Sequence, residues 1–239
     1  MQLPHFVSLH EHGSRMREAH SAMSAATSKE ASAELTEVLE AYRLAIELIS
    51  SAASVTEGTY ERSSAAMNLI EGILAGFIVG LTLVEHAILS GYTAQSAALV
   101  RQELEAIAAL EEIKVGRRIE GRTPNVRHLP NIPGRVYSDL SELTHFSRSS
   151  ALELVGKYRG EDPDAPENTT QWLLSPQHVP NTTRQLFALH TVLLLHFVLH
   201  QSDHYASLRR TTPIIQDVPE FQQAVKILEH AGVIEVSIR

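Results

Sequence analysis

The sequence predicts an all-α protein: a helical bundle of four to five long helices with two long connections and a short C-terminal helix. The first observation is that several long segments repeat their apolar residues at spacings of three and four, the period of an amphipathic helix. The second is that prolines occur in two polar stretches, residues 116–133 and 161–170, which interrupt the helical pattern. The third is the composition, 44% hydrophobic and 20% charged residues, which is ordinary for a folded globular domain.

The N-terminal part divides into an arm and a first core helix. Residues 1–28 are polar, rich in histidine and weakly periodic, so we expect an N-terminal arm there and a single helical-bundle domain over residues 29–239. Between residues 29 and 55 the apolar side chains recur every three or four positions, which predicts the first core helix. These side chains are Leu35, Val38, Leu39, Tyr42, Ile46 and Ile49.

Residues 61–90 form the second predicted helix and contain the most apolar stretch of the chain. Titratable side chains and regularly spaced glycines interrupt this stretch: Glu71, Glu85, His86, Gly72, Gly76 and Gly80. The pattern therefore favours a buried helix that packs closely through its glycines over a membrane span. Gly91 is placed to end this helix, and Thr93 to begin a third helix that reaches about residue 115.

The C-terminal half contains three further predicted helices. The fourth covers residues 134–158, and the fifth runs from about residue 181 to 208 with a middle so apolar that it must be buried. A last helix has Asp217 as a potential cap, Pro219 in its first turn and Gly232 just beyond its end. The tail after Gly232 alternates polar and apolar residues, which predicts a short strand.

Charge, cysteine content and the N-terminal residues exclude several classes of protein. The formal net charge of −8 provides no overall positive field to attract nucleic acid or an anionic membrane. The absence of cysteine excludes disulfides, thiolate metal sites and cysteine nucleophiles. The first residues lack the apolar core of a secretory signal, so we expect a cytoplasmic protein without a membrane partner. Because the long apolar helices offer surface to a second copy, we also expect a homodimer.

Five polar residues on the third and fourth predicted helices form the main candidate site. Arg101 and Glu105 lie four residues apart, as do Tyr137, Ser141 and His145, so each set shares one side of its helix. If the two helices face each other, the five side chains come together. The cluster then either fixes the helix register or lines a pocket that binds a small anionic ligand, with His145 and Glu105 available for acid–base chemistry.

These residues also carry a resemblance. The order of a Leu-Val-Arg helix with a following glutamate, a basic loop, and Tyr-x-x-Leu-Ser-x-x-x-His resembles an uncharacterised family of bacterial all-helical domains of unknown function. The matching segment, residues 91–150, is about a quarter of the chain. The resemblance implies an all-helical fold and a bacterial source, and it implies no particular activity.

Arg184 and His190, near the start of the fifth predicted helix, form a second candidate. An arginine followed by a histidine at such a position resembles the ribonuclease motif of the HEPN superfamily, whose members are helical bundles that often dimerise. The resemblance implies catalytic roles for Arg184 and His190. The alternative is that Arg184 has a structural role. An arginine at a helix N-terminus is disfavoured by the helix macrodipole, so we expect it to pair with an anionic group.

Three histidines of the fifth predicted helix form a third candidate, a site for a divalent metal. His196, His200 and His204 recur every four residues and partly share a face, so two of them could bind one ion. The arrangement resembles metal-binding four-helix bundles of the DinB family. The alternative is that these are buried structural histidines.

The loop between residues 114 and 135 is a local basic patch and the only expected contact for nucleic acid. It concentrates Lys114, Arg117, Arg118, Arg122, Arg127 and Arg135 against a single acid, Glu120. It contains no aromatic residue for base stacking, so a solvated loop is the alternative. The leading functional interpretation is a helical binding protein centred on the Arg101 cluster, with an enzymatic role left open.

Overall fold

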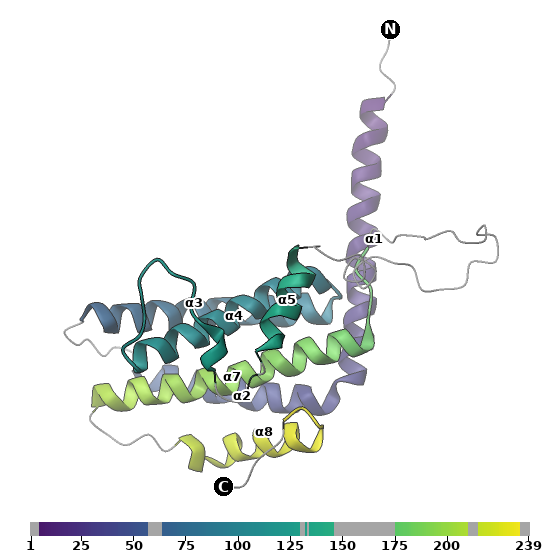
Figure 1. Cartoon of the computed structure of the whole chain (residues 1–239). Coiled ribbons are helices and arrows are strands. Elements are labelled where there is room, and N and C mark those ends of the chain that lie inside the picture. The colour runs from purple at the N-terminus through teal and green to yellow at the C-terminus, as the bar shows by residue number, and fades with distance from the viewer. Residues whose placement is uncertain are drawn as a thin grey trace.

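The protein is an all-α helical bundle, as the sequence predicts (Figure 1). The computed structural model describes residues 5–56, 64–129, 132, 134–145, 175–209 and 215–234. Within these residues the regular elements are helices, with no strand. The strand predicted after Gly232 and the second half of the fourth predicted helix, residues 146–158, fall mainly or wholly outside the described part of the chain.

Two helices cover the N-terminal region, and their boundary differs from the predicted one. α1, His5–Glu34, contains most of the expected arm, and α2, Thr36–Thr56, follows directly. The chain turns at Leu35, where the Thr36 Oγ1 donates a hydrogen bond to the Ala33 carbonyl oxygen at 3.1 Å. Such side-chain bonds to the preceding turn bend helices. The arm is therefore helical, and its N-terminal part projects away from the bundle (Figure 1).

α3, Ala65–Leu89, and α4, Thr93–Lys114, form a helical hairpin. The Ser64 hydroxyl caps α3 by accepting a hydrogen bond from the Met67 amide at 3.2 Å. Gly91 lies in the turn with a φ of 80°, as expected for the residue that ends a helix. A Cβ on Gly91 would lie 2.6 Å from the Gln177 carbonyl oxygen, so this position also requires glycine because another segment packs against it.

α7, Pro180–Arg209, is the central helix of the bundle and packs against α2, α3 and α4. Its middle is fully buried at Phe187, Leu193, Leu194 and Phe197. α8, Pro219–His230, covers α2 with Phe221, Ala224 and Leu228, which lie on one face of the helix. Pro219 stands in its first turn and Gly232 follows its end with a φ of 69°, as predicted, although Val218 rather than Asp217 is the capping residue.

The remaining short elements lie in two connections, one between α4 and α7 and the other between α7 and α8. A 3₁₀ turn, η1, covers Val126–His128, and α5, Arg135–His145, packs across α4. A second 3₁₀ turn, η2, covers Ile215–Asp217 and precedes α8. α5 is the described part of the fourth predicted helix.

α3 is not the central buried helix that the sequence predicts. One face packs on the bundle, but Val79 is 82% exposed and Leu83 is 55% exposed. Both α3 and α7 are long and apolar enough to cross a membrane by length and composition alone. The most apolar window of α7 is 61% buried within the bundle, whereas that of α3 is 39% buried. α3 therefore presents much more apolar surface than a core helix does.

Candidate functional site

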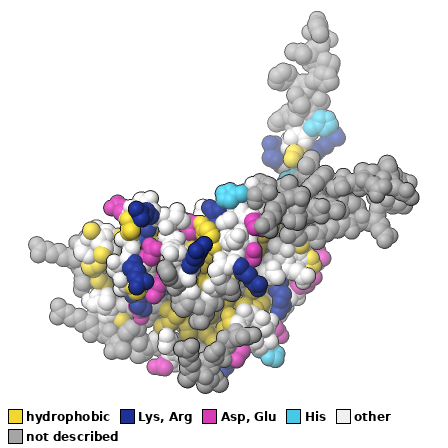
Figure 2. Space-filling model, in the orientation of Figure 1, with side chains coloured by type: hydrophobic (Ala, Val, Ile, Leu, Met, Phe, Trp, Pro, Cys, Tyr) yellow, Lys and Arg dark blue, Asp and Glu magenta, His cyan; other side chains and the backbone are white. Residues whose placement is uncertain are grey.

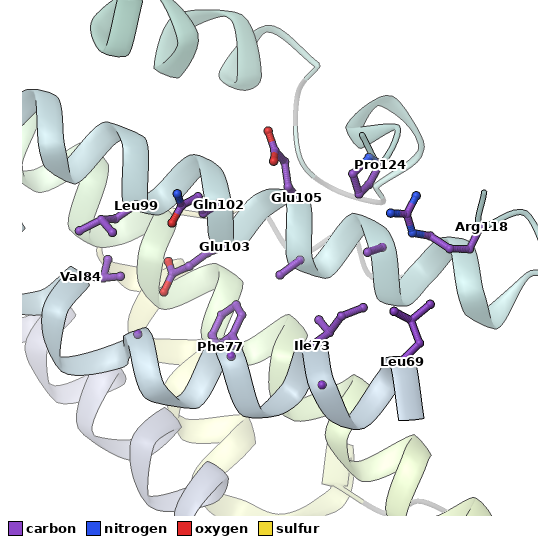
Figure 3. A pocket seen from close by; sticks show the side chains of 15 residues that line it. Leu69, Ile73, Phe77, Val84, Leu99, Gln102, Glu103, Glu105, Arg118 and Pro124 are labelled. Atoms are coloured by element: carbon purple, nitrogen blue, oxygen red, sulfur yellow. The ribbon is translucent and has the colours of Figure 1, made fainter. Parts of the chain in front are cut away.

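A groove runs between α3 and α4 and encloses about 400 Å³ (Figure 3). We call it the α3–α4 groove. Its walls are mainly apolar, and Arg118 and Pro124 close one end. The apolar side chains that line it include Leu69, Ile73, Phe77, Val84, Leu99 and Ala106. Mostly apolar concave sites with a few polar groups are typical of small-molecule binding.

Glu103 is one of the polar residues that line the groove. Figure 3 shows Glu103 between α3 and α4, near Val84 and Phe77, while Glu105 points away from α3. Glu103 is only 6% exposed. Its Oε2 lies 2.8 Å from the Nδ1 of His190, which is fully buried on α7. Its Oε1 is buried without a hydrogen-bond partner.

The Glu103–His190 pair lacks the partners that such a buried pair needs. Burial raises the pKa of the Glu103 carboxyl, and the nearby His190 opposes the rise. The His190 Nε2 is also buried without a partner, so the pair leaves unused hydrogen-bonding capacity at both ends. Leaving a buried polar atom unsatisfied costs about 1–3 kcal/mol, which marks Glu103 Oε1 as a place where a ligand would stabilise the fold.

A second, partly buried pair lies next to the first. The Tyr42 hydroxyl donates a hydrogen bond to Glu85 Oε2 at 3.0 Å. Burial, and then the charge of Glu85, raise the pKa of Tyr42 well above its usual range, so the phenol stays protonated and acts as a donor. The Tyr42 ring centroid lies 5.5 Å from that of His190 and 5.3 Å from that of Phe187. Tyr42 therefore packs against the imidazole that holds Glu103.

Gly72, Gly76 and Gly80 form the α3 side of the groove. A Cβ placed on any of the three would meet no atom within 4 Å. The prediction that these glycines let α3 pack closely inside the bundle is therefore wrong, because they border open space. Each glycine in a helix interior costs about 0.5–1 kcal/mol relative to alanine. The fold does not use the close approach that these glycines permit.

The predicted cluster on α4 and α5 does come together in space. Arg101 Nη1 lies 3.2 Å from His145 Nε2, and the Tyr137 hydroxyl donates to Glu105 Oε1 at 2.8 Å. Arg101 Nε lies 3.5 Å from Glu105 Oε1, and the guanidinium carbon lies 5.7 Å from the centre of the Tyr137 ring. The Ser141 hydroxyl instead donates to the Tyr137 carbonyl oxygen on its own helix, at 2.8 Å.

The charges of this cluster favour a structural role. The carboxylate of Glu105 balances the positive charge of Arg101 and also accepts the Tyr137 hydroxyl, whose pKa is raised first by this hydrogen bond. An added anion would compete with Glu105 for Arg101. The cluster therefore joins α4 to α5, and its role in binding an anionic ligand stays a prediction.

The structure does not bring Arg184 and His190 into one site. Arg184 is exposed near the start of α7, and its Nη2 donates to the Ala231 carbonyl oxygen at 2.8 Å, beyond the end of α8. His190 points into the core toward Glu103. Because Arg184 and His190 are six residues apart on a regular helix, their side chains point in different directions and contact different partners. The geometry gives no support to shared ribonuclease chemistry.

Two of the three predicted metal ligands on α7, His200 and His204, lie near separate carboxylates. His200 Nε2 lies 3.5 Å from Glu111 Oε2, and His204 Nε2 lies 3.6 Å from Glu71 Oε1. Burial lowers the pKa of both His196 and His200, against the opposing effect of Glu111. Among the described residues, the group with ligand atoms within 4.8 Å of one another is instead Glu30, Glu34 and His178.

Part of the predicted basic patch is used internally. The Arg118 guanidinium donates to the carbonyl oxygens of Ile119 and Arg122, at 2.8 and 2.7 Å, and lies 3.4 Å from Glu112. Lys114 pairs with Asp203 of α7 at 2.7 Å. Figure 2 shows lysine and arginine side chains interspersed with acidic side chains on the visible face of the bundle. Binding of nucleic acid here stays a prediction.

The sequence analysis missed Glu103, Tyr42 and Glu85 as site residues. A signal for Glu103 is present in the sequence. It lies three residues after Val100 and four before Ile107, so a helix places its carboxyl on the apolar face of α4, opposite in direction to Glu105. A carboxyl on a buried face is rare and marks a pair or a site. Its partner on α7 is identified only by the fold.

No family model, curated protein or solved structure matches the chain.

Proposed function

We propose that this is a ligand-binding helical protein that holds a small molecule in the α3–α4 groove. The ligand has an apolar body and one head group that donates a hydrogen bond. The observation that carries the proposal is that Glu103 lines the groove and that its buried Oε1 has no hydrogen-bond partner. The unpartnered oxygen fixes the position of the head group, and the apolar walls of the groove hold the body of the ligand.

The chemistry of Glu103 selects the head group. His190 occupies Oε2 at 2.8 Å, so Oε1 is the oxygen left to accept a hydrogen bond. A donor such as an amine or amide N–H on the ligand would satisfy this oxygen in a site sheltered from water. A carboxylate or phosphate head group would instead place its own negative oxygens against a buried carboxyl, which is unfavourable.

The shape of the groove selects the body of the ligand. Leu69, Ile73 and Phe77 form its apolar lining on α3, and the three glycines leave room where side chains would otherwise stand. Transfer of apolar surface from water into such a groove contributes about 25 cal/mol per Å². The glycines destabilise α3 by about 0.5–1 kcal/mol each, and a bound ligand explains why that cost is tolerated.

The test uses two fluorescent probes that differ in one atom group. N-phenyl-1-naphthylamine has an apolar body with one N–H donor, and phenylnaphthalene has nearly the same body without a donor. We expect the amine to bind at least about fivefold more tightly, the effect of one hydrogen bond of about 1 kcal/mol to a buried acceptor. Fluorescence titration of the full chain at constant salt measures both affinities.

A matched pair of variants locates the site. Gly76→Leu places a side chain in the open groove, whereas Ala75→Leu adds the same side chain one position away on an exposed part of α3. We expect Gly76→Leu to abolish binding of the amine and Ala75→Leu to leave it unchanged, with both variants folded by circular dichroism. Equal affinities for the two probes, or equal effects of the two substitutions, would contradict the proposal.

A further inference from the structure

A second concave site lies between α1 and the end of α3, away from the α3–α4 groove. It encloses about 380 Å³ and we call it the α1 pocket. Its residues on α1 are spaced three or four apart and share one face, which is turned toward the α3–α4 hairpin. The pocket is lined by Met16, Arg17, His20, Ser21, Ser24, His86 and Tyr92.

The polar groups of the α1 pocket are mainly hydrogen-bond donors. They comprise the guanidinium of Arg17, two imidazoles and three hydroxyls, and among the described residues no carboxylate lines the pocket. Although the chain has a formal net charge of −8, this lining combines the positive charge of Arg17 with hydroxyl and imidazole groups. Such a lining favours an anion over a cation or a neutral apolar molecule.

One buried polar atom in the pocket lacks a hydrogen-bond partner, the Nε2 of His20. Ser24 also lines the pocket, and the residue is 8% exposed. His86 is held at its other side, where Nδ1 lies 3.4 Å from the Ser90 hydroxyl. Buried polar atoms normally have partners, so the unpartnered His20 nitrogen indicates that a polar group binds between α1 and the hairpin.

We infer that the α1 pocket binds a phosphate group, free or as the monoester of a small organic molecule. Arg17 supplies the charge-assisted hydrogen bonds, and the Ser24 hydroxyl and His20 supply the donors deeper in the pocket. The volume exceeds that of a phosphate ion, and Met16 and the Tyr92 ring provide an apolar wall for an attached organic group. This inference is independent of the ligand proposed for the α3–α4 groove.

Isothermal titration calorimetry of the full chain tests the inference with inorganic phosphate and phenyl phosphate at constant ionic strength. The variants Arg17→Gln and Arg15→Gln form a matched pair, because both remove one positive charge from exposed positions of α1 and only Arg17 lines the pocket. We expect Arg17→Gln to weaken binding about tenfold, the loss of one charge-assisted hydrogen bond, and Arg15→Gln to have no such effect.

Ser24→Ala provides a second measurement inside the pocket. It removes the hydroxyl with almost no change of volume, and we expect weaker binding with an unchanged unfolding temperature in the absence of ligand. Tighter binding of phenyl phosphate than of phosphate would assign the site to a monoester, and equal binding to the free ion. Failure of both probes to bind saturably, or an equal loss in the two arginine variants, would overturn the inference.

Discussion

Replacing the three glycines of α3 by alanine should stabilise the free protein. At Gly72, Gly76 and Gly80 an added Cβ meets no atom within 4 Å, so no steric penalty opposes the gain in helix propensity. Each substitution should contribute about 0.5–1 kcal/mol, and the triple variant about 1.5–3 kcal/mol. For a domain of this size that corresponds to a rise in unfolding temperature of about 3–12 °C.

Urea unfolding followed by circular dichroism measures the effect on the triple variant and on each single variant. Ala75→Gly is the matched control, because Ala75 is exposed on the same helix and the reverse substitution should destabilise by about 0.5–1 kcal/mol. Additivity of the three single changes is expected, since no shared neighbour couples them. A destabilised triple variant would refute the reasoning, because it would mean that another part of the protein occupies the space beside α3.

Two further predictions concern pH. Burial raises the pKa of the Glu103 carboxyl, so above about pH 4.3, the ordinary carboxyl value, the folded state retains a proton that the unfolded chain loses. The free energy of unfolding should therefore fall as the pH rises. Urea titrations at several pH values should show that Glu103→Gln removes this slope, and an unchanged slope would contradict the assignment. Burial lowers the pKa of His200 against the opposing Glu111, so the unfolded chain takes up more protons below about pH 6.5 and stability falls on acidification. His200→Gln should lose less stability than the native chain between about pH 6.5 and 5, and an equal loss would refute this assignment.

The Arg101 cluster shows which side-chain contacts the periodicity of a helix can predict. The four-residue spacing within 101–105 and within 137–145 places each set on one side of a helix, and the structure brings Arg101, Glu105, Tyr137 and His145 together. Periodicity places Glu105 beside Arg101 on the same helix, but it could not show that the Tyr137 hydroxyl donates to Glu105, because that contact joins two helices. Ser141 shares the spacing but bonds to its own helix.

The α3–α4 groove could not be predicted from the periodicity of the sequence. The glycines of α3 were visible in the sequence, and the apolar run around them is typical of a buried helix. Whether such a helix lies at the centre or at the edge of a bundle depends on which other apolar faces compete for the core. α7 takes the central place, so α3 lies outside and its glycines face open space.

By itself the sequence determined the helical class, most helix positions and the turn residues, because spacing, glycine and proline act locally on the backbone. Gly91 and Gly232 end α3 and α8 with positive φ where the local pattern places them. Only the tertiary structure paired Glu103 with His190 across two helices and left one carboxyl oxygen without a partner. That pairing joins residues 87 positions apart, and only the packing of α4 against α7 brings them into contact.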